Sequence, residues 1–137
     1  MADVHDIATR SYNMSRIRSK DTKPEMLVRK YLFAQGFRYR LHDKKLPGKP
    51  DIVLPKYKTV IFVHGCFWHG HAHCKYYVIP KTRTDWWLEK INRNIANDKK
   101  AIKELKRLGW KVITIWGCQL KNNTIEKSFE TLIRTLI

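Results

Sequence analysis

Apolar side chains recur every three or four positions in three stretches of the chain, which is the spacing of one buried helix face. Thr22 and Glu25 match a capping box at the start of the first stretch, and Gly36 and Gly109 follow the first and second stretches as stop signals. The pattern therefore predicts three helices, at residues 22–35, 84–108 and 124–136.

Four shorter segments have the apolar content of strands. Residues 37–41 alternate between apolar and basic side chains and predict a half-buried strand, whereas the continuous apolar run 59–63 predicts a central strand covered on both faces. Residues 51–54 and 110–116 complete the set. Helices flanking a mixed sheet form an α/β sandwich, and 137 residues with 43% hydrophobic content predict one domain, residues 1–137.

The chain is strongly basic, with 28 Lys and Arg residues against 12 Asp and Glu residues and a formal net charge of +16. An excess of this size, interleaved with Trp and Tyr, predicts a nucleic-acid partner rather than an acidic lipid surface or mere solubility. Residues 1–20 form a basic segment that we interpret as ordering on that partner, with a frayed terminus as the equal alternative. Because no apolar run approaches bilayer length, we expect no membrane partner and a cytoplasmic location.

The segment between the third predicted strand and the second helix lacks a regular period but holds four histidines and two cysteines, which predicts a functional loop. An odd number of cysteines in a reducing compartment favours a metal site over disulfides. Three Cys and one His suit a closed structural zinc site, with His73 as the rival histidine and cysteines buried as small apolar side chains as the alternative. The candidate zinc ligands are Cys66, His71, Cys74 and Cys118.

A carboxylate and an imidazole are expected to meet at one edge of the sheet, because Asp51 begins one predicted strand and His64 follows the next. Phosphodiester hydrolysis uses a divalent metal, held by a carboxylate and a backbone carbonyl, together with a general base. Histidine titrates close enough to neutrality for the second task, and His69 is the candidate. Singly, Asp51 could be a turn residue and His69 a zinc ligand or surface group, but as a set they favour a nuclease site.

Two further acids occupy helix positions where the spacing calls for an apolar residue. Glu25 precedes Val28 on the first helix, and Asp98 falls between Ile95 and Ile102 on the second. An inward carboxylate is costly unless it is paired, so both are site candidates. The capping box competes as an explanation of Glu25, and a solvent-reaching position at the edge of the stripe competes for Asp98.

Aromatic side chains amid basic residues can insert between the bases of a duplex. Phe67 and Trp68 in the loop and Trp87 at the start of the second helix are the candidates. Core packing is the alternative for Trp87, because Ile91 lies four residues further along the same face. No such packing partner accounts for Trp68, which makes it the better candidate for a wedge.

Four segments resemble the very-short-patch repair endonucleases, the Vsr family, in a match that runs from the first residue to about Leu120. Within them the stretch from His64 to His69 is highly specific for that family. The segments are Met1-Ala-Asp-Val-His-Asp6, Leu46-Pro-Gly-Lys-Pro-Asp51, Val60-Ile-Phe-Val-His-Gly-Cys-Phe-Trp-His69 and Thr82-Arg-Thr-Asp-Trp-Trp-Leu-Glu-Lys-Ile91.

The resemblance implies a restriction-endonuclease-like fold of the PD-(D/E)XK type, a three-layer sandwich with a mixed central sheet and a structural zinc. It implies a magnesium-dependent, strand-specific DNA endonuclease that nicks 5′ of the thymine in T:G mismatches left by deamination of 5-methylcytosine. The expected partner is double-stranded DNA containing that mismatch. We expect a monomer that associates with the nucleoid when active, with other repair proteins as further partners.

The resemblance also implies roles for the candidate residues. Asp51 and the carbonyl of Val63 would hold Mg²⁺, and His69 would be the general base. Val63 stands where a Thr is often found, which suits a role for its carbonyl alone. Glu25, His64 and Asp98 would complete the polar site; Cys66, His71, Cys74 and Cys118 would bind Zn²⁺; and Phe67, Trp68 and Trp87, with Met14, Arg16 and Lys20 of the N-terminal segment, would contact DNA.

Two points stay open at this stage. The zinc loop reads His71-Ala-His73-Cys74, whereas some family members are one residue shorter, so the choice between the two histidines is not fixed. Two other functions are also consistent with the residues. One is a restriction-type endonuclease that cuts both strands of matched DNA, and the other is a non-catalytic, zinc-stapled DNA-binding module.

Overall fold

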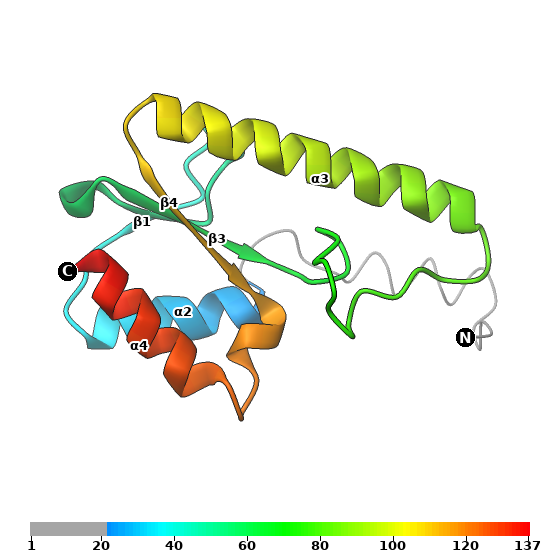
Figure 1. Cartoon of the computed structure of the whole chain (residues 1–137). Coiled ribbons are helices and arrows are strands. Elements are labelled where there is room, and N and C mark those ends of the chain that lie inside the picture. The colour runs from blue at the N-terminus through cyan, green and yellow to red at the C-terminus, as the bar shows by residue number, and fades with distance from the viewer. Residues whose placement is uncertain (1–21) are drawn as a thin grey trace.

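The computed structural model describes residues 22–137, and its helices and strands follow the order expected from the sequence (Figure 1). The predicted N-terminal contacts Met14, Arg16 and Lys20 lie outside the described residues. The elements are α2 (Lys23–Ala34), β1 (Arg40–Leu41), β2 (Ile52–Leu54), β3 (Thr59–His64), α3 (Thr84–Arg107), β4 (Lys111–Trp116) and α4 (Ile125–Leu136), with short 3-10 helices at Pro55–Tyr57 and Gly117–Leu120.

The four strands form one mixed sheet in the order β1-β2-β3-β4. β1 and β2, and β2 and β3, pair antiparallel, whereas β3 and β4 pair parallel. Because parallel strands end at the same edge of a sheet, the ends of β3 and β4 lie together, and His64 pairs with Trp116 in the register. This edge carries the loop that follows β3.

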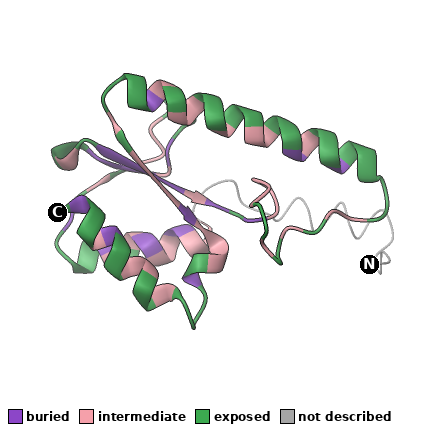
Figure 2. Cartoon of the chain, in the orientation of Figure 1, coloured by how far each residue is buried: buried purple, intermediate pink, exposed green. Residues whose placement is uncertain are grey.

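Side chains of the central strands alternate between two apolar layers. Ile52 and Ile61 pack in the cluster that includes α2 and α4, while Val53 and Val60 pack in a second cluster with Leu105 of α3. Figure 1 shows α3 on one side of the sheet and α2 and α4 on the other, and Figure 2 shows buried strands between these helices. The molecule therefore has three layers, as the amphipathic helices and the continuous apolar strand predicted.

One predicted strand is much shorter than expected. Of residues 37–41, only Arg40 and Leu41 pair with β2, while Phe37 and Tyr39 pack in the core without joining the ladder. The antiparallel register would put Tyr39 opposite Leu54, which is the last residue before the helical turn Pro55–Tyr57. Leu54 still pairs with Thr59 of β3, so the β1–β2 ladder ends one residue before β2 does, next to this helical turn.

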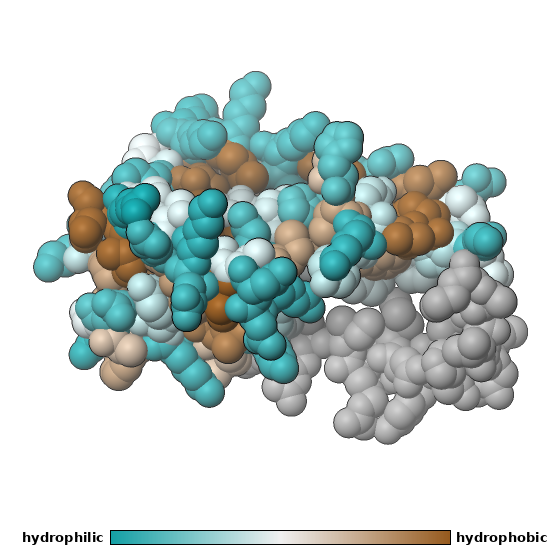
Figure 3. All heavy atoms as spheres, turned by 60° about the horizontal axis from the view of Figure 1, so that its bottom comes forward, coloured by the Kyte–Doolittle hydropathy of each residue, from teal (hydrophilic) through white to brown (hydrophobic). Residues whose placement is uncertain are grey.

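The face that Figure 3 brings forward is covered largely by hydrophilic side chains, with apolar ones in small groups. Among the described residues, no helix combines the length and the apolar character that crossing a bilayer requires.

Candidate active site and metal cluster

Three cysteines and one histidine converge beyond the ends of β3 and β4. Their ligand atoms all lie within 4.8 Å of one another. The backbone N–H of Cys118 donates to Cys66 Sγ at 3.4 Å, and Cys118 Sγ lies 3.5 Å from His71 Nδ1. Cys118 reaches this position because β4 runs parallel to β3 and ends at the same edge. The members of the cluster are Cys66, His71, Cys74 and Cys118.

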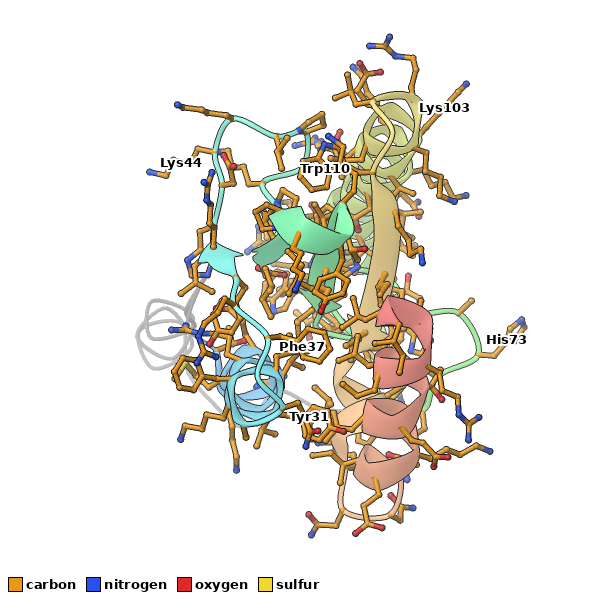
Figure 4. The ribbon with its side chains drawn as sticks, turned by 90° about the vertical axis from the view of Figure 1, so that its left-hand side faces the viewer. Tyr31, Phe37, Lys44, His73, Lys103 and Trp110 are labelled. Carbon is orange, nitrogen blue, oxygen red and sulfur yellow. The ribbon has the colours of Figure 1, made fainter. Side chains whose placement is uncertain are left out.

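His73, the rival ligand in the sequence, is not part of this cluster. It is exposed, its φ is 59°, and Figure 4 shows its side chain at the outside of the molecule, directed away from the fold. His71 is partly buried and stacks on Trp116, with ring centroids 4.1 Å apart and planes 3° from parallel. The fold thus brings His71 rather than His73 to the thiols.

The donor set fits a tetrahedral cation. Thiolate and imidazole ligands bind structural zinc at roughly 2.0–2.3 Å, which places ligand atoms within about 4 Å of one another. Burial, followed by the neighbouring thiol of Cys66, raises the pKa of Cys118 to about 12. Burial of Cys118 beside the other thiols disfavours its thiolate, and a bound cation would offset that cost.

Asp51 lies just before β2, beside the end of β3. Its Oδ2 accepts a hydrogen bond of 2.7 Å from the backbone N–H of Val63. Burial raises the pKa of Asp51 to about 6; the Val63 hydrogen bond opposes this shift, and the charge of Glu25 adds to it. A carboxylate in such a desolvated position gains from a nearby divalent cation, so Asp51 is suited to hold one.

Asp98 faces inward from α3 and pairs with His69 of the loop. Asp98 Oδ2 lies 2.6 Å from His69 Nδ1, and both side chains are about a quarter exposed, at 26% and 28%. The inward position suggested by the helical spacing is the one adopted. Since the carboxylate occupies Nδ1, Nε2 is the ring nitrogen of His69 that remains for a substrate or water.

His64 is the last residue of β3, and its ring lies flat against that of His69. The two ring centroids are 3.8 Å apart and the planes 3° from parallel. Burial lowers the pKa of His64 to about 4, and the neighbouring His69 acts in the same direction. Near neutral pH His64 is therefore an uncharged ring that restricts the orientation of His69.

Glu25 is a buried carboxylate rather than the second half of a capping box. The Thr22 hydroxyl accepts a hydrogen bond from the Glu25 backbone N–H at 3.4 Å, as a helix cap should. The Glu25 side chain is only 2% exposed and pairs with His42 and with Arg29, one turn further along α2. Its ligand oxygen, the His42 ring nitrogen and an Asp51 oxygen lie within 4.8 Å of one another.

The three predicted wedge residues form one aromatic cluster. Phe67 contacts Trp68 and Trp87 with ring centroids 5.3 Å apart in both pairs, and Trp68 and Trp87 are separated by 5.7 Å. Trp87 is 9% exposed and belongs to the interior, as its relation to Ile91 indicated, whereas Trp68 is only partly covered. Asn94 Nδ2 donates to the Trp68 carbonyl at 2.8 Å, which fastens the loop to α3.

Comparison with known proteins identifies the family. A family model described as "DNA mismatch endonuclease Vsr" matches residues 2–76. The chain belongs to this family. The DNA mismatch endonuclease Vsr of Escherichia coli K12 is 50% identical over 121 residues, which cover 88% of this chain and 77% of that protein.

Relatives with nicking activity in their names agree with this assignment. The Type II nicking enzyme V.NmeAIP of Neisseria meningitidis serogroup A is 58% identical over 91% of this chain and 89% of its own length. The Type II nicking enzyme V.XorIIP of Xanthomonas oryzae pv. oryzae is 49% identical over 89% of each chain. The sequence-based prediction of a Vsr-family DNA endonuclease is therefore confirmed, and its substrate is DNA.

In the described part of this Vsr-family chain, sequence reasoning missed several residues that contact the site, above all Trp116 and His42. Trp116 stacks on His71 and meets the His64 ring edge-on at 5.3 Å, so it joins the cysteine cluster to the histidine pair. The sequence could have indicated Trp116 only through its position, because it is the last residue of β4, the strand that pairs with β3. His42 was missed because only the hairpin register places it opposite Asp51.

Proposed function

We propose that this Vsr-family endonuclease nicks one DNA strand 5′ of the thymine in T:G mismatches that arise by deamination of 5-methylcytosine. The observation that carries the proposal is the position of Trp68, in the aromatic cluster with Phe67 and Trp87, one residue before the His69–Asp98 pair. A probe for distorted base pairs and a base for hydrolysis would thereby share the same short loop. The relative named DNA mismatch endonuclease Vsr supports the choice of a mismatch over matched DNA.

The carboxylates of Asp51 and Glu25, which lie close together and are called the acidic edge of the sheet, would supply the hydrolytic chemistry. Asp51 and the Val63 carbonyl would hold Mg²⁺, which when bound polarises the phosphate and lowers the charge that develops on it. Asp98 holds His69 through Nδ1, so Nε2 is positioned to take a proton from the attacking water. His64, uncharged and stacked on His69, keeps that ring in one orientation.

The cysteine cluster would hold a structural Zn²⁺ with four protein ligands and no open position for catalysis. Three of its members come from the loop after β3, and Cys118 comes from the 3-10 helix Gly117–Leu120 that follows β4. The ion would therefore fix the loop that carries Trp68 and His69 to the sheet. This role differs from that of Mg²⁺, which would take part in the reaction.

A duplex panel tests the proposed function. We expect Mg²⁺-dependent nicking of one strand of a T:G duplex and little or no cleavage of the T:A and C:G duplexes of the same sequence. The measurement is the single-turnover rate on each strand, labelled separately. Cleavage of both strands of matched DNA would instead indicate a restriction-type enzyme, and binding without any cleavage would indicate a non-catalytic module.

His69 is expected to dominate proton transfer. We predict that His69→Ala lowers the nicking rate by about 10²–10⁴-fold, the usual contribution of a general base. His73→Ala is the matched control, because His73 lies in the same loop but is exposed and away from the cluster. Both variants are compared at saturating DNA and Mg²⁺. A loss of less than about tenfold in His69→Ala would leave the histidine with a packing role only.

Trp68 is expected to govern the selectivity for a mismatch. Wedge insertion requires unstacking, which costs least where pairing is already distorted, whereas phosphate contacts are the same in both duplexes. A stacked base contributes about 1–3 kcal/mol, so Trp68→Ala should reduce the ratio of T:G to matched rates by roughly 5- to 150-fold. Trp68→Phe keeps a ring and should retain most of the ratio. An unchanged ratio in Trp68→Ala would assign selectivity to hydrogen bonds instead.

A further inference from the structure

His42 occupies a constrained backbone position directly across the hairpin from Asp51. Its N–H donates to the Asp51 carbonyl at 3.1 Å, which continues the β1–β2 pairing one residue beyond Leu41 and Ile52. Its φ of 47° lies in the left-handed region, which a residue with a Cβ adopts infrequently. Backbone geometry of this kind persists where the surrounding contacts enforce it.

The side chain of His42 contacts both oxygens of the Glu25 carboxylate. Nε2 lies 3.0 Å from Oε1 and 2.9 Å from Oε2, and Arg29 Nη1 lies 3.2 Å from Oε2. A donor shared by both oxygens fixes the direction in which the carboxylate points, while the Arg29 contact to Oε2 restricts its rotation about the terminal bond. Because Glu25 is 2% exposed, water does not provide a substitute donor.

We propose that His42 is a positioning residue that orients Glu25 beside Asp51 and thereby sets the affinity of the acidic edge for its divalent cation. The inference rests on the proposed function, in which Asp51 holds that cation. Partners that orient groups around a metal typically change its affinity 10–100-fold when removed. The Nε2 of His42 is engaged by Glu25, so His42 acts through that carboxylate rather than as a ligand itself.

The test compares two amide variants that differ in reach. Gln carries its amide nitrogen at about the distance of histidine Nε2, whereas Asn is one methylene shorter and is well tolerated at positive φ. Mn²⁺ binding to the zinc-loaded, full-length protein without DNA is followed by the loss of the free Mn²⁺ signal in electron paramagnetic resonance. We expect His42→Asn to weaken binding about 10–100-fold and His42→Gln to stay within about threefold of wild type. The Mn²⁺ binding that remains in Asp51→Asn is counted as binding outside the site.

A double-mutant cycle of His42 and Glu25 separates positioning of the carboxylate from direct ligation of the cation by His42. In a Glu25→Gln background the loss caused by His42→Asn should largely disappear, because the group that His42 orients has changed. Zinc content and melting temperature confirm that each variant is folded. Unchanged Mn²⁺ affinity in His42→Asn, or an undiminished effect in the Glu25→Gln background, would overturn the proposal. Mn²⁺ binding is measured without DNA, so failure of the wild type to nick T:G duplexes would refute the proposed function separately.

Discussion

Asp51→Asn is expected to abolish Mg²⁺-dependent nicking while leaving the affinity for DNA within about threefold of wild type. The substitution keeps the size of the side chain and an oxygen that can accept from Val63, but it removes the charge that would hold the cation. A catalytic metal contributes several kcal/mol to stabilisation of the transition state, which corresponds to a rate loss of roughly 10³-fold or more. Affinity survives because a molecule of net charge +16 has many other contacts for phosphates.

The matched control is Asp43→Asn in the β1–β2 connection. Asp43 Oδ1 accepts a hydrogen bond from the Lys45 N–H at 2.9 Å, and an Asn oxygen can do the same. The two variants lose the same charge, so a difference between them reports the position of the carboxylate rather than the general electrostatics of the protein. Single-turnover nicking and DNA binding are measured on one T:G duplex. Turnover close to that of wild type in Asp51→Asn would remove Asp51 from the reaction.

The fold was largely predictable because each layer leaves a periodic trace in the sequence. The inward stripe of α3, including Ile91 and Leu105, set the limits of that helix to within one residue at its end. The continuous apolar run in β3 identified the central strand, since both of its faces are covered. The predicted strand at residues 37–41 was too long, because the length of a strand depends on the partner with which it pairs and β2 has only three residues.

Parts of the site were predictable for a different reason. Asp98 broke the apolar stripe of α3, and a carboxylate that is largely covered needs a partner, which here is His69. Cys118 was identifiable from the scarcity of cysteines and its place after β4. Each of these residues is of a type that its own segment does not require, a carboxylate in an apolar stripe or a scarce cysteine, and this difference points to a role outside the segment.

His42 and Trp116 do not stand out from their segments in this way. What matters for both residues is their register, opposite Asp51 and His64 respectively. Register depends on pairing between segments that are distant in sequence. The choice of His71 over His73 is similar, because it is decided by the path of the loop around Trp116 rather than by spacing.

Loss of the fourth ligand of the proposed zinc site is expected to have the largest effect on stability. Zinc bound by three Cys and one His contributes folding free energy on the order of 10 kcal/mol in small metal-nucleated domains, compared with about 5–15 kcal/mol for the stability of a whole protein. In this chain the apolar cluster formed by α2, α4 and the sheet is independent of the thiols. Cys118→Ala should therefore lose zinc and destabilise the loop after β3 by several kcal/mol, while the sheet and its helices persist.

Three measurements on Cys118→Ala examine this expectation, with His73→Ala as the control that should keep its metal. Elemental analysis should give about one zinc per chain in wild type and in His73→Ala and much less in Cys118→Ala. Amide exchange should accelerate in the loop before it does in the paired strands β3 and β4, because Cys118 links that loop to the end of β4. Nicking should fall even though Cys118 is not one of the candidate catalytic residues, since Trp68 and His69 depend on the loop for their positions. Active wild-type protein that contains no zinc would contradict the cluster as a metal site, and loss of zinc in His73→Ala would contradict the assignment of His71.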